Sequence, residues 1–116
     1  MLEKFSWKTT ESEKLNDKIS RQMIFGESAM LARILLSRGA IVPRHSHVNE
    51  QITWILSGAL KLIFDDHETV LREGEFLLIP ASVPHAAEAL EDTVDIDVFA
   101  PPRQDWIKKT DAYLRR

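Results

Sequence analysis

Three of the four histidines are spaced as the ligands of a single metal ion would be. His45 and His47 are separated by one residue, and alternate residues of a β-strand point to the same side, so both imidazoles are expected together. Gln51 has the same parity and would join them if the chain stays extended. A bend at Val48 and Asn49 would undo this count, so the parity favours Gln51 as third ligand without fixing it.

The fourth predicted ligand lies in a second segment of the chain. His85 follows residues 80–84, a proline-bounded turn that would bring its imidazole in from another strand. An isolated His-x-His pair is more often a surface feature, but here a carboxamide and a further histidine follow the pair. Imidazole nitrogen and amide oxygen bind first-row divalent ions at roughly 2.0–2.2 Å. The sequence therefore predicts one divalent transition metal (Zn, Ni, Mn, Co or Fe) held by His45, His47, Gln51 and His85.

The predicted ligands also decide which chemistry the metal would support. Three neutral imidazoles and a neutral amide leave the charge of a divalent ion uncompensated, which favours Lewis-acid chemistry and binding of an anion. The set lacks the carboxylate of an Fe(II) facial triad, which disfavours an oxygenase. The chain has no cysteine, so thiolate ligands and disulfides are excluded. The remaining histidine, His67, follows Asp65 and Asp66 and is predicted to be an exposed turn residue.

Composition limits the class of protein. The chain has 116 residues, 44% of them hydrophobic, which suits one domain with its own core. Lysine and arginine number 15 against 18 acidic residues, a net charge of −3 that offers no broad basic surface for nucleic acid. Residues 1–10 form no signal-peptide core, and no apolar stretch approaches the roughly 20 residues that span a bilayer. We therefore expect a single domain over residues 1–116, in the cytoplasm, that binds neither nucleic acid nor membrane.

Eight short segments separated by turn residues predict an all-β jelly-roll barrel. The predicted strands are 18–25, 29–36, 51–56, 60–64, 69–71, 75–79, 85–88 and 93–99. Beyond residue 102, Trp106, Thr110 and Tyr113 recur at helical spacing, which predicts a short C-terminal helix over about 105–115. Asp105 is expected to cap that helix.

One predicted strand is apolar on both faces. Ile52, Trp54 and Leu56 share one side of segment 51–56, while Ile55 lies on the other. Since one face must point to the core, something must cover the other. Two alternatives are open: another segment of the same chain, or a second copy in a homodimer.

The two ligand-bearing segments, 39–58 and 74–89, resemble the two characteristic motifs of the cupin superfamily, whose members are small β-barrels with a metal inside the barrel. The matching positions are Gly39, His45, His47, Gly58, Gly74, Pro80 and His85, and Gln51 stands at the motif's remaining ligand position. The sequence departs from the usual motifs at three positions, with Gln51 in place of glutamate, Ser82 in place of glycine and Ala89 in place of asparagine. The resemblance implies a small single-domain cupin barrel.

The last predicted strand, 93–99, adds two aspartates. Asp95, Asp97 and Phe99 share one side of it. Asp95 is expected to face water. The segment from Asp97 to Arg103 resembles the C-terminal signature of the uronate-linearising cupins of pectin and alginate catabolism, often called KdgF. Further similarity lies at 83–85, 88–92 and 111–115, while Ala100 and Gln104 depart from that family's usual serine and acidic residue.

This resemblance implies a metal-dependent enzyme. Its substrates would be 4,5-unsaturated monouronates, the small anionic sugars released by polysaccharide lyases, and its product the linear 4-deoxy-5-keto uronate. Asp97 would be the general acid/base, because ring opening and ketonisation both move protons. Arg103 would offer its planar fork to a carboxylate, and Phe99 an apolar wall. The structural alternatives are a surface ion pair for Arg103 and core packing for Phe99.

Two other functions are compatible with the same residues, since a fold does not fix a function. One is a metal-dependent cupin that binds a sugar or another anion without turnover. The other is a cupin dioxygenase, which Gln51 disfavours because it replaces the carboxylate ligand. A binding protein could dispense with an aspartate facing the metal, whereas the enzyme needs Asp97 there.

Overall fold

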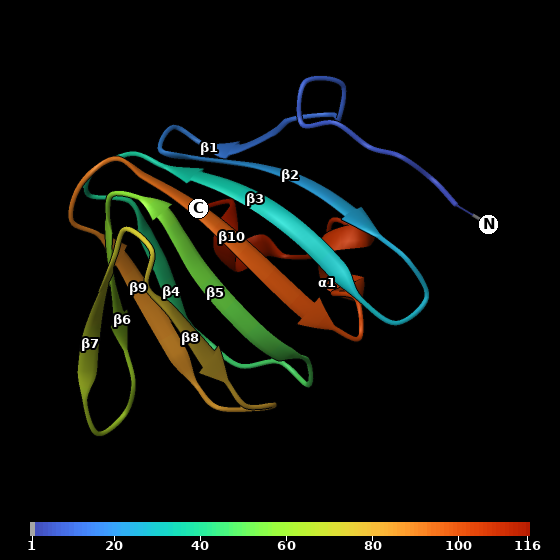
Figure 1. The fold of residues 1–116 in the computed structure, drawn as a ribbon. Helices are drawn as coiled ribbons and strands as arrows, with labels where there is room; N and C mark the ends of the chain where they lie inside the picture. The colour runs from blue at the N-terminus through green and yellow to red at the C-terminus, as the bar shows by residue number, and fades with distance from the viewer. Residues whose placement is uncertain (1) are drawn as a thin grey trace.

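The structure is a computed structural model that describes residues 2–116, in which ten strands form two antiparallel sheets (Figure 1). The strands are β1 (Glu13–Asn16), β2 (Ile19–Phe25), β3 (Met30–Leu36), β4 (Ile41–His45), β5 (Glu50–Ser57), β6 (Ala59–Ile63), β7 (Glu68–Arg72), β8 (Phe76–Ile79), β9 (His85–Ala89) and β10 (Thr93–Ala100). The larger sheet has the order β1-β2-β3-β10-β5-β8, and the smaller one β4-β9-β6-β7. The all-β jelly-roll prediction is confirmed.

All eight predicted strands are present, and the sequence analysis missed β1 and β4. β1 has a single buried apolar residue, Leu15, so it shows no alternation. β4 contains Pro43, which cannot donate to a neighbouring strand. The structure tolerates this proline because β4 is an edge strand whose register shifts between Val42 and His45.

The core lies between the two sheets and changes character along them. β3 points Met30, Ala32, Ile34 and Leu36 inward, in strict alternation. On the facing smaller sheet, β6 and β9 contribute Leu60, Leu62, Ala87 and Ala89. The inward positions of β5 and β10 are partly polar instead, with Gln51, Thr53, Asp95 and Asp97 buried. Burying polar groups costs free energy, so their presence on the inner wall of the barrel indicates a functional site there.

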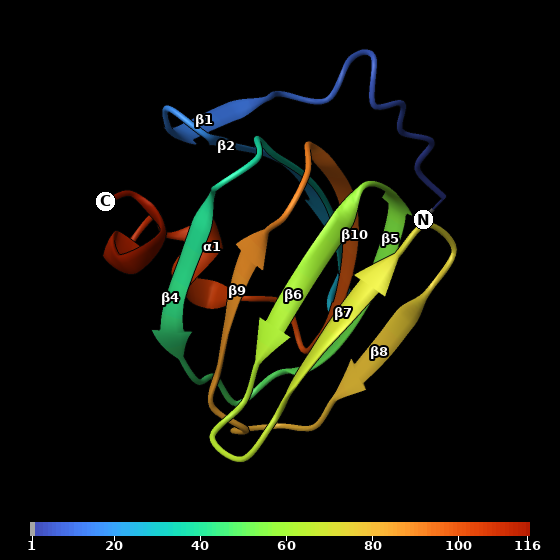
Figure 2. The same cartoon turned by 90° about the vertical axis from the view of Figure 1, so that its left-hand side faces the viewer.

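The C-terminal segment lies beside β4 at the side of the barrel (Figure 2). The helix predicted over 105–115 is present but shorter, since α1 spans Gln104–Ile107 and a separate 3₁₀ turn spans Ala112–Leu114. The chain leaves the helix at Lys109, whose φ of 57° is left-handed. Asp105 is not the cap, because its carboxylate accepts hydrogen bonds from a side chain instead. Within residues 2–116, neither helix is long or apolar enough to cross a bilayer.

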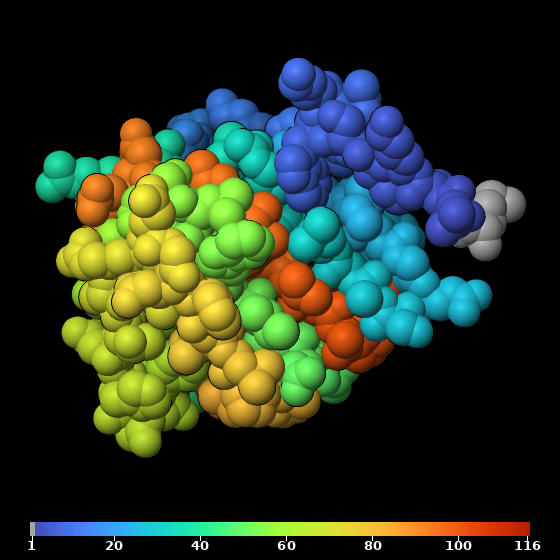
Figure 3. All heavy atoms as spheres, in the orientation of Figure 1, coloured from blue at the N-terminus to red at the C-terminus, as the bar shows by residue number. Residues whose placement is uncertain are grey.

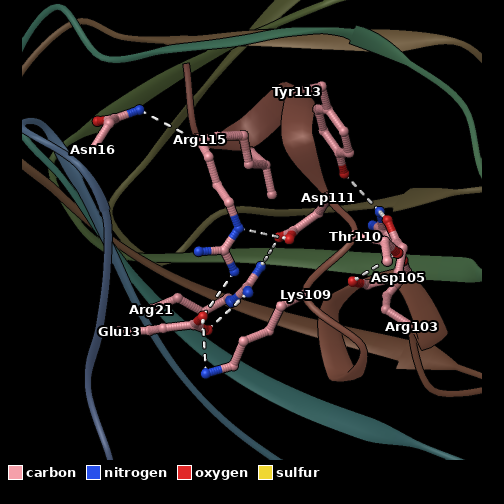
Figure 4. A network of polar contacts seen from close by, with 11 residues as sticks. Glu13, Asn16, Arg21, Arg103, Asp105, Lys109, Thr110, Asp111, Tyr113 and Arg115 are labelled. Atoms are coloured by element: carbon pink, nitrogen blue, oxygen red, sulfur yellow. Dashed lines mark hydrogen bonds and ion pairs between the residues drawn. The ribbon is translucent and has the colours of Figure 1, made fainter.

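A network of ion pairs joins this segment to β1 and β2, as Figure 4 shows. Arg21 is 1% exposed and donates to Asp111 and Glu13, both at 2.8 Å. Arg115 donates to the other oxygens of the same two carboxylates, at 2.9 and 2.7 Å. Because each carboxylate binds two guanidinium groups, residues 111–115 are fixed against the start of the barrel.

The outer face of the larger sheet is apolar over β5 and β8. Ile52 and Trp54 of β5 lie opposite Leu78 and Phe76 of β8, and the four side chains are 40%, 45%, 56% and 68% exposed respectively. Figure 3 looks onto this face, where the side chains of β3, β10, β5 and β8 form one continuous surface. Of the two alternatives for this face, cover by another segment of the chain is therefore not found over β5 among residues 2–116. The N-terminal segment lies elsewhere, where Phe5–Trp7 form a groove with β2 and β3.

Candidate metal centre

Three histidines meet at one end of the barrel. His45 ends β4 and His85 begins β9, and the two are direct partners in the smaller sheet. His47 lies two residues beyond the end of β4, and its carbonyl accepts a 2.7 Å hydrogen bond from the Ser82 amide. The candidate ligand atoms of the three imidazoles lie within 4.8 Å of one another, so the group could hold a metal ion.

Backbone carbonyls set the protonation of each ring. The Nδ1 atoms lie 2.8 Å from Pro43 O in His45, 3.1 Å from Asn49 O in His47 and 2.8 Å from Val83 O in His85. A carbonyl only accepts, so each Nδ1 carries the hydrogen and donates it. Each neutral imidazole is left with a free lone pair on Nε2, which is the form that binds a metal.

Burial keeps these imidazoles neutral. It lowers the pKa of His45 and His47 to about 4, and the positive charge of Arg103 acts in the same direction. Burial also lowers the pKa of His85. His85 Nε2 is buried and, among the residues that the structure describes, has no hydrogen-bond partner. A buried polar atom without a partner is costly, and a bound cation would satisfy it.

Gln51 presents an oxygen to the same cluster. Its Oε1 lies 3.1 Å from His47 Nε2, and both atoms carry lone pairs once Nδ1 holds the ring hydrogen. Two ligands of one ion at roughly 2.0–2.2 Å lie about 3 Å apart when they subtend a right angle. This donor set therefore fits a divalent transition metal. The neighbouring Glu50 is exposed and does not join it.

The chain brings Gln51 there by a different route from the parity count. The extended course ends at His45, the chain bends at Val48 and Asn49, and β5 then belongs to the other sheet. Gln51 on β5 is paired with Phe99 on β10, so the two side chains lie on the same face of the sheet. Because Phe99 is buried in the barrel interior, Gln51 points inward as well. The sequence predicts which side chains of one strand share a face. Which sheet each strand joins depends on contacts made throughout the barrel.

The cavity inside the barrel brings the predicted site residues together. It has a volume of about 50 Å³ and opens partly to solvent. Six of the seven predicted site residues line it, namely His45, Gln51, His85, Asp97, Phe99 and Arg103. The ring of the seventh, His47, makes edge contacts with His85 and Phe99, at centroid distances of 5.2 and 5.7 Å. The rest of the wall is mainly aliphatic side chains from both sheets, together with Arg21, Thr53, Asp95, Trp106 and Tyr113.

Two carboxyl groups share the inner side of β10. Asp95 and Asp97 are each 4% exposed, so the expectation that Asp95 faces water is wrong. Burial raises the pKa of both, and the charge of Asp97 raises the pKa of Asp95 further. Of the two carboxyl groups, Asp95 is therefore the one that more strongly favours the protonated form. The available signal was the shared parity with Asp97, which places both side chains on the barrel's inner wall.

Arg103 lies inside the molecule rather than on its surface. It is 1% exposed, and its Nε and Nη2 atoms donate to Asp105 at 3.0 and 2.8 Å. Arg103 therefore forms the ion pair considered for it, but its side chain is buried rather than at the surface. The pair occupies the Nε and Nη2 edge of the guanidinium group. The guanidinium also lies over the rings of Phe99 and Trp106, 5.0 and 4.7 Å from their centroids.

Phe99 combines its two predicted roles. It lines the cavity and is 1% exposed, while its ring packs edge-on against Trp106 at 4.8 Å. Tyr113 is a site residue that the sequence analysis missed. Its ring stacks on His45 at 4.6 Å, and its hydroxyl accepts a 2.6 Å hydrogen bond from Arg103. Its helical spacing indicated only packing, and the break at Lys109 is what turns it toward the cluster.

Comparison with known proteins agrees with this architecture. A family model for the cupin domain matches residues 32–99. An RmlC-like cupin from Shewanella frigidimarina superposes with a TM-score of 0.83 and 30% identity, covering 90% of this chain and 96% of that one. KdgF from Halomonas sp. superposes with a TM-score of 0.82 and 27% identity, covering 88% and 97%.

More distant similarity concerns the fold alone. An oxalate decarboxylase from Bacillus subtilis, described with Mn(II) centres, has a TM-score of 0.75 at 21% identity, and the match covers 83% of this chain but 28% of that one. No curated protein sequence matches this chain. The family model covers more than half of the sequence, and the Shewanella and Halomonas structures match nearly end to end. The chain therefore belongs to the cupin domain family.

Proposed function

We propose that this cupin holds one divalent transition metal and converts 4,5-unsaturated monouronates to the linear 4-deoxy-5-keto form. The observation that carries the proposal is the position of Asp97. This buried carboxyl accepts a hydrogen bond from Thr53 and lines the same cavity as histidines of the three-histidine cluster. Similarity to the Halomonas KdgF structure supports the choice of substrate. The proposed ligands are His45, His47, Gln51 and His85.

The chain's own residues account for the proton movements. Opening the cyclic hemiacetal removes the proton of the anomeric hydroxyl while the ring C–O bond breaks, and the resulting enolate becomes a ketone when its carbon is protonated. The reaction is an isomerisation, so one carboxyl can take the proton and return it. Burial raises the pKa of Asp97 above its usual range, toward the pH at which a carboxyl both accepts and donates. When bound, a divalent ion supplies Lewis-acid stabilisation of substrate oxygens.

Arg103 and Phe99 would orient the sugar. Arg103 is held by Asp105 and Tyr113, so it acts as a fixed positive charge beside the cluster and attracts the substrate carboxylate. The ring of Phe99 gives the cavity an apolar wall next to His47. Both side chains are 1% exposed, so they are already in place before a ligand arrives.

The proposal is tested by mixing the metal-loaded protein with monomers made by a polysaccharide lyase. The conjugated double bond absorbs in the ultraviolet, so turnover appears as a loss of absorbance faster than in buffer. Protein stripped with a chelator is the control, and re-addition of metal should restore the rate. A metal-loaded protein that gives no acceleration would overturn the proposed reaction.

One observation favours a second candidate, a metal-dependent cupin that binds an anionic sugar without turnover. The Nε and Nη2 edge of Arg103 is occupied by Asp105, so Arg103 can attract an anion by its charge but cannot use that edge to orient a substrate carboxylate for turnover. Saturable binding of the monouronate by calorimetry, with no loss of absorbance, would select this candidate. A dioxygenase stays disfavoured, because the cluster around the candidate metal contains histidines and no carboxylate among the described residues.

A further inference from the structure

One buried hydroxyl connects the candidate metal ligands to the proposed acid/base. Thr53 lies on β5 directly opposite Asp97 of β10 and is 1% exposed. Its Oγ1 is 2.7 Å from Gln51 Nε2 and 2.8 Å from Asp97 Oδ1. Gln51, Thr53 and Asp97 thus form an unbroken line of hydrogen bonds inside the barrel.

The direction of these bonds follows from the hydrogen available. A threonine hydroxyl has one hydrogen, and the Asp97 oxygen accepts it. Thr53 Oγ1 can then only accept from Gln51, and the NH₂ group is the only part of that carboxamide that donates. The amide oxygen must therefore point the other way, toward His47.

The opposite orientation of the amide would be favourable if Thr53 did not prevent it. A reversed carboxamide would place its NH₂ against the lone pair of His47 Nε2, which is an ordinary hydrogen bond. An NH₂ group has no lone pair to give a metal, so that orientation removes one ligand. Something has to hold Gln51 in the orientation that leaves two lone-pair atoms 3.1 Å apart.

We infer that Thr53 is a positioning residue, which fixes the Gln51 amide with its oxygen toward the metal site and holds Asp97 in the cavity. The inference rests on the proposed function for the roles of Gln51 and Asp97. It goes beyond that function by naming the group that positions both residues. One hydroxyl fixes the orientation of the Gln51 amide and the position of the Asp97 carboxyl. Loss of this hydroxyl should weaken metal binding and turnover together.

The test compares Thr53→Val, which keeps the shape but removes the hydroxyl, with Thr53→Ser, which restores it. Thr93→Val is the matched control: Thr93, on β10, is likewise buried, but among residues 2–116 its hydroxyl bonds only backbone groups of Ala59 and Glu91. Metal affinity is measured by competition with a chelator, and the absorption spectrum of bound Co(II) reports its ligands. We expect Thr53→Val to bind metal about 10–100-fold more weakly with an altered spectrum, as loss of such supporting bonds typically does. Thr53→Ser and Thr93→Val should resemble the wild type.

A second measurement needs no variant. In the NMR spectrum of the metal-free wild type, the Gln51 NH₂ protons should show cross-relaxation with the Thr53 methyl group. Cross-relaxation with the His47 ring instead would overturn the inference, and so would a Thr53→Val protein that matches Thr93→Val in affinity and spectrum.

The outcomes separate this inference from the proposed function. If the wild type binds metal but does not turn over uronates, and Thr53→Val still binds more weakly, only the reaction is wrong. If the wild type turns over uronates and Thr53→Val matches the control, only the role of Thr53 is wrong. A wild type that binds none of the metals offered would overturn both.

Discussion

Inside the barrel, two carboxyl groups lie next to a cluster of imidazoles, and their different partners give them different roles. Asp97 accepts from Thr53, whereas Asp95 Oδ1 is buried and, within the described residues, has no partner. Two carboxyl groups this close cannot both ionise without a large cost, so one of them keeps a proton. Asp95 is the group that keeps it, which leaves Asp97 free to exchange a proton with a ligand.

Replacing Asp97 with asparagine should stop the reaction without emptying the metal site. The introduced amide would still accept from Thr53 through its oxygen, but it could not take up a proton. We expect turnover to fall by at least about 100-fold, the usual contribution of an acid/base group, with metal content unchanged. Asp66→Asn, at the exposed hairpin tip, is the control. A wild-type rate for Asp97→Asn at saturating metal would show that another group moves the proton.

Replacing His85 with alanine should remove metal binding while leaving the barrel folded. His85 Nε2 is the buried atom that a metal would satisfy, and the alanine would leave two imidazoles and Gln51. We expect affinity to fall at least about 100-fold, more than for a residue that only supports a ligand. Calorimetric titration measures it, and His67→Ala is the control because His67 lies on the exposed hairpin tip, where its ring bonds Asp66. Equal affinity of the two variants would contradict the assignment.

At the residue scale, the sequence shows groups with distinctive chemistry and misses those whose role depends on burial. His45, His47 and His85 could be predicted because the His-x-His pair is followed by a spaced carboxamide and by a further histidine after a proline-bounded turn. Thr53 could not, since a hydroxyl on a strand has the same local pattern whether its side faces water or the barrel interior, whereas the shared parity with Asp97 could have placed Asp95 inward. Only the register of β5 against β10 decides the side that Thr53 faces.

At the scale of elements, the C-terminal segment is both a wall of the site and the hardest part to predict. The helical spacing of Trp106 and Tyr113 predicts one helix, but Lys109 turns left-handed and divides it. Local propensity is weak over so short a segment, and tertiary contacts decide its course. The contacts in question are the ion pairs of Arg21 and Arg115 with Glu13 and Asp111.

This network should make stability depend on pH through Glu13. Burial raises the pKa of Glu13, but the hydrogen bonds from Arg115 and Arg21 outweigh it, so the pKa lies below its ordinary value of 4.5. The charged form is therefore favoured by folding, and its stabilisation is complete above pH 4.5 and lost as the pH falls through the folded-state pKa. Urea unfolding at several pH values should show the wild type losing stability over this range, and Glu13→Gln should lose less.

At neutral pH, Glu13→Gln should lower the free energy of unfolding by about 2 kcal/mol, the usual contribution of hydrogen bonds to a charged group. Glu11→Gln, on an exposed neighbour, is the control and should change neither the stability nor its pH dependence. If Glu13→Gln and the wild type lost stability in parallel on acidification, the ion-pair network would not account for the acid sensitivity.

At the scale of the whole molecule, we propose that the apolar outer face of the larger sheet joins two copies of the chain. Leu35, Ile52, Trp54, Leu56, Phe76 and Leu78 are each 38–68% exposed. At about 200 Å² for each large side chain, these six expose roughly 570 Å². That is the upper range for the largest patch on a monomer and most of the roughly 800 Å² that each partner buries in a stable interface.

Sedimentation velocity at micromolar concentration should therefore show a dimer. Trp54→Glu places a charge at the centre of the patch and should produce a monomer, because an unpaired charge cannot be buried in an apolar interface. Ile41→Glu is the control, since Ile41 is 54% exposed but lies on β4 in the other sheet. A wild-type monomer, or a Trp54→Glu protein that still dimerises, would contradict the proposal.

The position of β10 has a consequence for how the protein is made. β10 is the last strand in the sequence, yet it is the one that joins β3 to β5 in the larger sheet. On a ribosome that adds about 5–20 residues per second, the edges of β3 and β5 stay open for on the order of seconds before β10 emerges. All four proposed metal ligands are synthesised before Asp97, so the nascent chain carries these groups before the carboxyl proposed as the acid/base. The unpaired edges of β3 and β5 are then where the growing chain is most exposed to aggregation and most in need of a chaperone.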